Sequence, residues 1–398
     1  MRRLSQLLVI LCGAILLMSL FRVFRTRTLL SYGGRSLEQW TAEAERANQL
    51  RFSSPAAGQD LEQARKAIRA IGTNAMPRIL ALLNSPRELT IQDQAANFLA
   101  TNFPSFGIAI RNPSQRWIQG IRGFEALGEL ASPWIPELVA ATTNNIGYGS
   151  AALVAVGAPA LPAVTNLLAS SAFPLTGNLI GAFANAIYSG RISESAATIA
   201  LPSLVAVAES KDSHARGYAL TALGAIHQQP ELCIPTLLKA VSDPSPQIQE
   251  NAIRALGAFG PIAGDQVAAV AARFKDAPWM TRHAICSALA RWPNGAAVSV
   301  PVLLQALRDP ELTVRISAAT ALGEIRADPG EVVPALMETA TETNETLRIM
   351  TLQSIGHFGT NGLPAKTLLE AHLNDPSPTV RDTASTALKR VRGEIPPP

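Results

Sequence analysis

The chain has 398 residues, too many for one ordinary compact core, so several domains or an elongated repeat array are expected. Hydrophobic residues make up 47% and aromatic residues only 5%, a mixture that favours closely packed helices over a β-sandwich. The net charge of +4 comes from residues 1–35, which hold six arginines and no acid; the remainder has 28 basic against 30 acidic residues. Such a body lacks the basic excess typical of nucleic-acid-binding proteins.

Residues 4–21 form an uncharged run, LSQLLVILCGAILLMSLF, flanked by arginines on both sides. Eighteen helical residues span about 27 Å, just enough for a hydrocarbon core. The run predicts a membrane anchor within residues 1–30. A cleaved signal peptide is the alternative, although no convincing small-x-small cleavage site follows the run. Because arginines flank both ends, the orientation stays open, with a slight preference for an extracytoplasmic body.

Residues 31–54 are expected to form a linker and a capping segment. The stretch GRSLEQW at 34–40 predicts a short helix whose Trp40 covers the apolar end of the first repeat. From 55 to 201 irregular helical repeats are expected, since Gly followed five residues later by Pro marks a helix end and the next helix start. This signature occurs at Gly72/Pro77, Gly128/Pro133, Gly157/Pro162 and, later, Gly359/Pro364.

Residues 138–190 contain no charged and no histidine side chain. Prolines and glycines interrupt the stretch, so it does not predict a second membrane span. Two interpretations stay open. The stretch forms tightly packed small-residue repeats with an uncharged polar surface, or it presents an apolar face to a partner.

Residues 202–393 repeat with a period of 33 residues, and three ladders share this step. A Leu or Ile recurs at Leu223, Leu256, Leu289, Leu322, Ile355 and Leu388. An acidic residue recurs at Asp243, Asp276, Asp309, Glu342 and Asp375. An arginine recurs at Arg282, Arg315, Arg348 and Arg381, with Arg216 in register and Gln249 interrupting the series. Three ladders in one register indicate stacked copies of one structural unit.

Around the Leu ladder, small and large apolar residues fall at i, i+3, i+4 and i+7, which is one face of an α-helix. A polar series lies between them and is expected on the solvent face. The large apolar series is Ile226, Phe259, Trp292, Ile325, Phe358 and Val391, and the polar series is Thr221, Arg254, Ser287, Thr320, Gln353 and Thr386.

The turns predict two helices in each unit, for example about 296–308 and 311–325. In Asp243-Pro244, Asp309-Pro310 and Asp375-Pro376, the Asp is expected to cap a helix that begins at the Pro. The glycines after the Leu ladder are expected to close helices in a left-handed conformation. These glycines are Gly224, Gly257, Gly323 and Gly356.

Residues 309–323 follow the pattern D-P-x-x-x-V-R-x-x-A-x-x-A-L-G, which resembles HEAT-like repeats, especially the short type named after phycobilisome lyases. The resemblance is sharp over 202–393 and weak over 55–201. It implies that an Asp and an Arg six residues apart link neighbouring repeats. This role falls on Asp276/Arg282, Asp309/Arg315 and Asp375/Arg381, whereas Gln249 and Glu342 depart from the pattern.

No residue pattern predicts catalysis, cofactor binding or a metal site. The histidines lack metal-ligand spacing, and neither a nucleophile motif nor a phosphate-binding loop is present. Cys12 lies in the apolar run, and Cys233 and Cys286 are too far apart in sequence to indicate a disulfide framework.

The cluster Trp279, Met280 and His283 beside Asp276 departs from the equivalent positions of neighbouring repeats, which are mostly polar or aliphatic. Aromatic and methionine side chains at a helix start can anchor an interface. Packing between repeats is the alternative use of Trp279.

The sequence therefore predicts an all-α solenoid of stacked antiparallel helix pairs, preceded by one transmembrane or signal-anchor helix. Its segments are the anchor (1–30), the linker and cap (31–54), degenerate repeats (55–201), regular repeats (202–393) and a tail (394–398).

The expected function is a non-enzymatic, single-pass, membrane-tethered scaffold for protein partners, in contact with the membrane through residues 4–21. No cofactor, metal, small-molecule substrate or nucleic acid is expected. The resemblance leaves a phycobilin-lyase-like or other enzyme as the alternative, and a nucleic-acid-binding HEAT-like protein as a weaker one.

Overall fold

The structure is a computed structural model. It describes residues 30–51, 53–85, 112–144, 146–170, 176–260 and 266–398, with a few positions between 88 and 101. The expected anchor, residues 4–21, lies outside the described residues. Within the described part, no helix has both the length and the apolar character needed to cross a bilayer.

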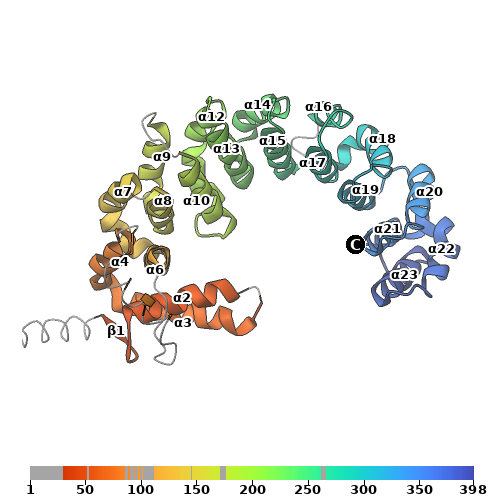
Figure 1. Cartoon of the computed structure of the whole chain (residues 1–398). Helices are drawn as coiled ribbons and strands as arrows, with labels where there is room; N and C mark the ends of the chain where they lie inside the picture. Colours follow the sequence, from red (N-terminus) through yellow and green to blue (C-terminus); the bar gives the residue numbers. More distant parts are fainter. Residues whose placement is uncertain are drawn as a thin grey trace, which may run out of the picture. The chain divides into compact units, whose positions relative to one another are not determined.

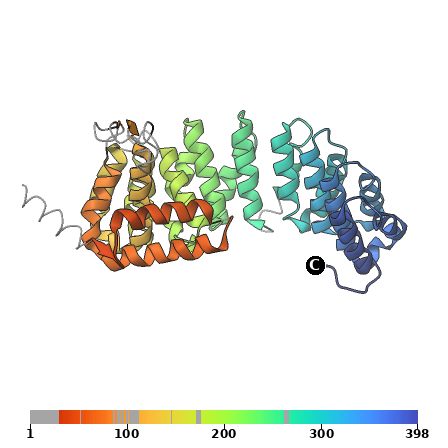
Figure 2. The same cartoon turned by 60° about the horizontal axis from the view of Figure 1, so that its bottom comes forward.

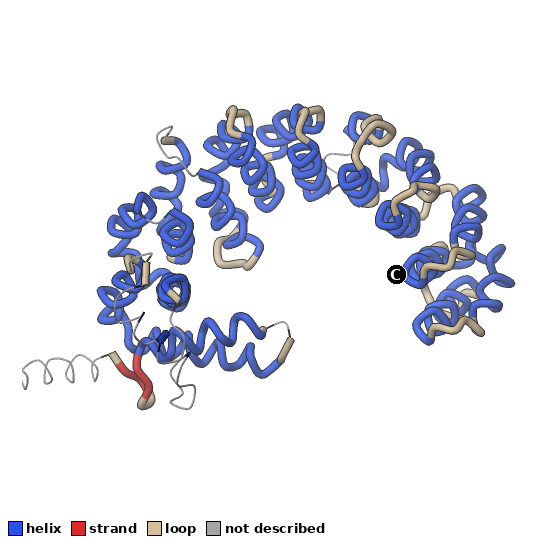
Figure 3. Tube along the Cα trace, viewed as in Figure 1, coloured by secondary structure: helices blue, strands red, loops and turns tan. Residues whose placement is uncertain are grey.

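Helices joined by short turns make up almost all of the described chain (Figure 3). A two-stranded antiparallel hairpin, β1 (Ser31–Tyr32) and β2 (Arg35–Ser36), precedes the first described helix. The chain divides into two compact units, Met1–Ser193 (unit 1) and Glu194–Pro398 (unit 2).

In unit 1, helices pack as successive neighbours. The helices are α2 (Leu37–Leu50), α3 (Pro55–Ile71), α4 (Met76–Leu83), α6 (Pro113–Leu127), α7 (Ile135–Asn144), α8 (Ile146–Ala155), α9 (Leu161–Ala169) and α10 (Thr176–Tyr188). Helices α2 and α3 pack on each other and on α6, whereas α6 packs on α4 and α8, and α8 packs on α7 and α10. In Figure 2, α2 and α3 run across the direction of the other helices of this unit.

The capping segment forms a longer helix than the sequence predicts. Helix α2 begins at Leu37 because Ser36 and Gln39 form a reciprocal capping box, and it continues to Leu50. Trp40 is buried, as expected. Its indole N–H donates to the carbonyl of Tyr32 at 2.9 Å, and the Arg35 guanidinium lies 4.9 Å from the ring centroid. Trp40 thus fixes the hairpin to the helix.

The Gly–Pro signature marks helix boundaries as predicted. Gly72, Gly128, Gly157 and Gly359 all have positive φ, a conformation that favours glycine. A short 3₁₀ turn follows each of these glycines, and the next α-helix comes directly after the turn.

Where the charge-free stretch 138–190 is described, its larger apolar side chains are buried, among them Leu138, Leu153 and Phe183. Tyr188 is the large hydrophobic side chain exposed among its described residues. The other exposed positions hold alanine, glycine, proline and uncharged polar residues. The described residues therefore agree with tightly packed small-residue repeats, and an apolar binding face stays a hypothesis.

In unit 2, helices alternate between two layers (Figure 1). We call the first layer the inner helices: α13 (Ser213–Ile226), α15 (Pro246–Ala258), α17 (Trp279–Leu289), α19 (Leu312–Ile325), α21 (Glu345–His357) and α23 (Pro378–Val391). The outer helices are α12 (Leu201–Ala208), α14 (Pro230–Val241), α16 (Val267–Ala271), α18 (Ala296–Ala306), α20 (Pro329–Thr339) and α22 (Lys366–His372), with the short α11 (Glu194–Ala197) before them. Each inner helix packs on the next inner helix, so the stacking predicted from the 33-residue period is confirmed.

The core of unit 2 consists of the ladders read from the sequence. All members of the Leu ladder and of the large apolar series are buried, including the fully buried Trp292. These side chains lie between the two layers of helices. Neither layer could bury them alone.

The glycines after the Leu ladder do not end helices. Gly224, Gly257, Gly323 and Gly356 lie inside the inner helices, and the left-handed residues that end α13 and α19 are His227 and Arg326. A Cβ on Gly224 would lie 2.7 Å from the Cα of Ala255 in the next inner helix. These glycines therefore allow close approach between helices, and their predicted role as left-handed helix ends is wrong.

Candidate functional site

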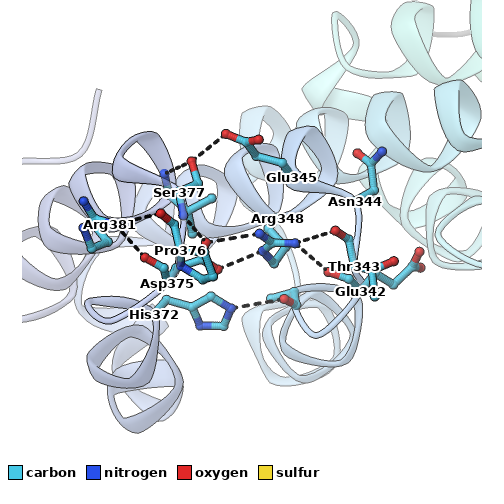
Figure 4. Close-up of polar contacts among 12 residues, drawn as sticks. Glu342, Thr343, Asn344, Glu345, Arg348, His372, Asp375, Pro376, Ser377 and Arg381 are labelled. Carbon is cyan, nitrogen blue, oxygen red and sulfur yellow. Dashed lines mark hydrogen bonds and ion pairs between the residues drawn. The ribbon is translucent and has the colours of Figure 1, made fainter.

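Arginines on the inner helices form cross-links between repeats, which we call rungs. Arg282 of α17 donates through Nε and Nη2 to Asp309 of the next repeat, at 2.6 and 2.8 Å. Arg348 binds Asp375 in the same bidentate way, at 3.0 and 3.1 Å (Figure 4). Two parallel hydrogen bonds to one carboxylate fix both distance and orientation.

Two further rungs join residues 27 positions apart in the chain. Arg216 forms an ion pair with Asp243, and Arg315 donates to Glu342 at 3.0 Å. Glu342 therefore takes part in a rung, although the sequence pattern excluded it. At the last repeat, Arg381 contacts only its own turn among the described residues, where Nη1 donates to the carbonyls of Asp375 and Pro376.

The six-residue spacing serves a different contact from the one the resemblance implied. Arg315 Nη1 donates to the backbone carbonyl of Asp309 at 2.8 Å, and its ion pair is with the following repeat. Asp309 accepts from the preceding repeat's Arg282. The Asp309/Arg315 pair thus links neighbouring repeats through partners on opposite sides. Of the Asp375/Arg381 pair, Asp375 binds the preceding repeat, and Arg381 stays on its own turn.

The sequence predicts that the aspartates of the rungs cap helices that begin at the following prolines. This prediction is wrong. Asp243, Asp309 and Asp375 each accept from the backbone amide two residues ahead, at 2.9 Å in all three turns. The helices begin later, at Pro246, Leu312 and Pro378. A side chain that closes its own turn is an alternative to a helix cap for Asp.

The charges of the rungs lower the pKa of two acids. Burial alone would raise the pKa of Asp309, but hydrogen bonds from Arg282 and from the amide of Glu311, with the arginine charges, hold it below its usual value. The same competition lowers the pKa of Asp375, through the amide of Ser377 and Arg348. Both carboxylates are ionised at neutral pH and hold the turns in place.

One rung is vacant. Gln249 stands where an arginine is expected, and its side-chain amide donates to the carbonyl of Asp243 at 2.7 Å. Asp276, the acid in register with it, is exposed and forms no ion pair or side-chain hydrogen bond with another described residue. The predicted link through Asp276 is therefore wrong, because the preceding repeat supplies no guanidinium.

The solvent-facing side chains of the inner helices form what we call the inner face. The predicted polar series lies there, half-buried or exposed. Several of its hydroxyls bond their own helix, as Thr320 does with the carbonyl of Ile316 at 3.0 Å. Between α17 and α21 the inner face also carries apolar side chains: Met280, Ile316, Ile349 and Met350.

Trp279 and Met280 begin α17, and each is 42% exposed. Trp279 is therefore partly packed against the protein and partly open to solvent. His283, one turn further on, is half-buried; burial and the charge of Arg254 lower its pKa, and Glu250 opposes this shift. At neutral pH this imidazole is neutral.

Unit 1 contains a charge network that the sequence did not reveal. Arg122 of α6 contacts Glu45 of α2 at 2.7 Å and Glu125 at 2.5 Å, and Glu125 also binds Arg191 at 3.0 Å. Burial would lower the pKa of Arg122, but the two carboxylates raise it above its usual value. The network ties α2 and the segment after α10 to α6. No 33-residue register exists here to expose such pairs.

The clefts of unit 2 lie along the rungs. One, of about 620 Å³, is lined by residues that include Lys275, Arg282 and Asp309, and another, of about 650 Å³, by residues that include Arg315, Glu338 and Glu342. Both are open to solvent, and the lining of each includes charges that are paired in a rung. They are gaps between adjacent turns and do not enclose a ligand.

The described residues offer little reactive chemistry. Burial raises the pKa of Cys233 to about 11 and that of Cys286 to about 12, so neither is a thiolate nucleophile at neutral pH. No three His, Cys, Asp or Glu side chains of the described ranges come together as metal ligands would.

Comparison with known proteins identifies the repeat type. A model of HEAT repeats matches residues 201–290, 267–342 and 300–389. No curated protein matches the sequence. Among solved structures, an engineered protein has 16% identity and a TM-score of 0.48, with 88% of this chain and 99% of that chain covered.

Two natural proteins are also similar. An archaeal HEAT-like repeat protein from Thermococcus onnurineus NA1 has 15% identity and a TM-score of 0.41, with 59% of this chain and 98% of that chain covered. The CpcE–CpcF complex of phycocyanin lyase from Nostoc sp. PCC7120 has 18% identity and a TM-score of 0.36, with coverages of 58% and 94%. TM-scores below 0.5 are too low to support a conclusion about this chain. The sequence match and the stacked helix pairs together show that residues 201–389 are HEAT-like repeats in an all-helical, solenoid-like fold.

Proposed function

We propose that this protein is a non-enzymatic, membrane-tethered scaffold that binds protein partners through the inner face of unit 2. The observation that carries the proposal is the group of apolar side chains on that face, Met280, Ile316, Ile349 and Met350, which packing between repeats leaves partly open to solvent. Methionine and aliphatic side chains on an otherwise polar surface are typical of adaptable protein-binding sites.

The charge of unit 2 favours protein over nucleic acid as the partner. Residues 194–398 hold 17 basic and 20 acidic residues. Most inner-helix arginines near the turns are already paired with carboxylates of the next repeat. Few cations are therefore free to neutralise a phosphate backbone.

The chemistry of the described residues supports a binding role over catalysis. The two described cysteines are buried and protonated, and both clefts are open and contain charges that already serve as cross-links. Enzymes usually place perturbed titratable groups in an enclosed pocket with a free substrate position.

The tether is proposed on the sequence of residues 4–21, which is long and apolar enough to span a bilayer once. With a single anchor before the repeats, the chain would be tethered to the membrane, with its repeats on the extracytoplasmic side. A tether raises the effective concentration of a partner in the same membrane, so modest affinity would suffice.

The test is proximity labelling from intact membranes, with protease accessibility measured on the same sample. We expect protein partners to be enriched and their enrichment to be lost in Ile349→Asp, which places a charge in the apolar part of the inner face. Val298→Asp is the matched control, since Val298 is an exposed aliphatic residue on the outer helix α18. Enrichment of a small molecule or pigment without protein would contradict the scaffold.

Protease accessibility tests the tether. Cleavage of the repeats in sealed vesicles of one orientation and protection in the other would locate unit 2 on one side of the membrane. Recovery of the intact full chain in the soluble fraction would contradict the tether and leave the binding face as a separate question.

A further inference from the structure

We propose that Asp276, Trp279 and Met280 form a docking site for an arginine side chain of a protein partner. The proposal rests on the proposed protein-binding function and names the partner's chemistry. It starts from the rungs: at Asp243, Asp309, Glu342 and Asp375, the acid at this register position receives a guanidinium from the preceding repeat.

Asp276 has the same place in its repeat and lacks both partners that the other aspartates have. The preceding repeat offers Gln249, whose amide is turned to the carbonyl of Asp243. The residue two positions ahead is Pro278, which has no N–H to donate to the carboxylate. Asp276 is exposed, whereas Asp309 is 7% exposed. Its carboxylate is therefore accessible and has no ion-pair partner among the described residues.

The side chains that follow Asp276 suit an arginine. Trp279 and Met280 come three and four residues later, at the start of α17, and each is 42% exposed. An indole face attracts a guanidinium, which can stack on it while donating to a carboxylate. The thioether of Met280 would cover the aliphatic stem of such an arginine or an apolar residue beside it.

The cations of unit 2 close to this turn do not fill the vacancy. Arg282 is held by Asp309 and by the carbonyl of Ala277, at 2.7 Å from the latter. Lys275, the neighbour of Asp276 in the sequence, forms no ion pair with a described residue. Lysine would also be the weaker occupant, because the closed rungs at Asp309 and Asp375 use the two-pronged geometry that only arginine provides.

The occupant is thus a protein segment with an arginine next to an apolar residue. The site adjoins the apolar part of the inner face, because Met280 belongs to both. A partner that lies along the inner face would reach the vacant rung from α17.

The experiment selects random peptides from a phage-displayed library against the purified full chain. Wild type is compared with Asp276→Asn and with Gln249→Arg, which supplies the missing guanidinium from within the chain. Asp382→Asn is the control, since Asp382 is an exposed acid on the inner helix α23 with no side-chain partner among the described residues. Asp276 is exposed and unpaired, so its variant is expected to fold.

We expect peptides selected by wild type and by Asp382→Asn to be enriched in arginine next to an apolar residue, and both Asp276→Asn and Gln249→Arg to lose this enrichment. A selected peptide should bind Asp276→Asn at least about tenfold more weakly, and replacement of its arginine by citrulline should weaken binding to wild type similarly.

An unchanged arginine preference in Asp276→Asn and Gln249→Arg would overturn the proposal. Peptides that lack arginine and lose binding in Ile349→Asp would also overturn it, while the scaffold function would stand. Failure of wild type to select any peptide, together with unchanged labelling of partners by Ile349→Asp, would reject both.

Discussion

The turns at Asp309 and Asp276 occupy the same position in adjacent repeats and differ in every partner. Asp309 accepts two hydrogen bonds from Arg282 and one from the amide of Glu311. Asp276 accepts neither kind, because Gln249 replaces the arginine and Pro278 replaces the amide donor. A rung is therefore a property of two neighbouring repeats, and a repeat can keep its acid and still lose the link.

The largest expected change in the free energy of unfolding distinguishes Asp309 from Asp276. Asp309→Asn leaves the mostly buried Arg282 without a counter-charge, and we expect it to lower the free energy of unfolding by about 2–3 kcal/mol. Asp276→Asn removes an exposed, unpaired charge and should change that free energy by no more than about 0.5 kcal/mol. Urea unfolding followed by circular dichroism checks both. Equal losses would show that Asp276 is paired.

A rung also depends on how closely the inner helices approach. A Cβ on Gly323 would lie 2.5 Å from the Ser354 Oγ and 2.7 Å from its Cα, so Gly323→Ala should push α19 and α21 apart. We expect a loss of about 1–3 kcal/mol of unfolding free energy. Gly330→Ala in α20 is the control, because nothing lies within 4 Å of the added methyl group. A stabilising Gly323→Ala would contradict the close approach.

Acid should weaken the closed rungs. The folded-state pKa of Asp309 lies below its unfolded value of about 3.9, so its contribution to stability is complete above that value and is lost as pH falls through the folded pKa. The loss should be smaller than that of a full rung, since a protonated Asp309 still accepts hydrogen bonds. Urea unfolding from pH 5 downward should show a shallower decline in Asp309→Asn than in wild type.

The smallest expected change in the free energy of unfolding comes from a variant that closes the vacant rung. Gln249→Arg should pair with Asp276 and raise the free energy of unfolding by about 0.5–1 kcal/mol, because the acid is exposed and water screens the pair. Gln249→Arg combined with Asp276→Asn should lose the gain. A gain that persists in the double variant would come from the arginine itself and would argue against a vacancy at Asp276.

The sequence predicted what depends on periodicity. The buried faces of the inner helices follow from the 33-residue ladders, since a position that repeats in register meets the same environment each time. The 33-residue period does not reveal that Gly323 is a contact point inside a helix. A helix end and a close approach between two helices both favour glycine, so the sequence pattern is the same for both. It also did not identify the arginine that binds Asp309, since the partner 27 residues away is apparent only when repeats are stacked.

The sequence indicates part of the proposed binding region. Trp279 and Met280 depart from the repeat pattern, and the structure leaves both partly exposed. Ile316, Ile349 and Met350 do not stand out in the sequence, since an aliphatic residue in an apolar helix predicts burial unless its face is known. The Arg122 network in unit 1 lies outside any repeat register, so no ladder could reveal it.

The most direct measurement is photo-cross-linking in intact membranes, with a photoreactive residue placed either at Met280 on the inner face or at Val298 on the outer helix α18. Both side chains are exposed to a similar degree. A difference in cross-linking would therefore come from the face of unit 2 on which each residue lies. The proposed scaffold predicts cross-links to protein from position 280 and few or none from position 298. Cross-links to protein from position 298 alone would contradict the assignment of the inner face as the binding surface.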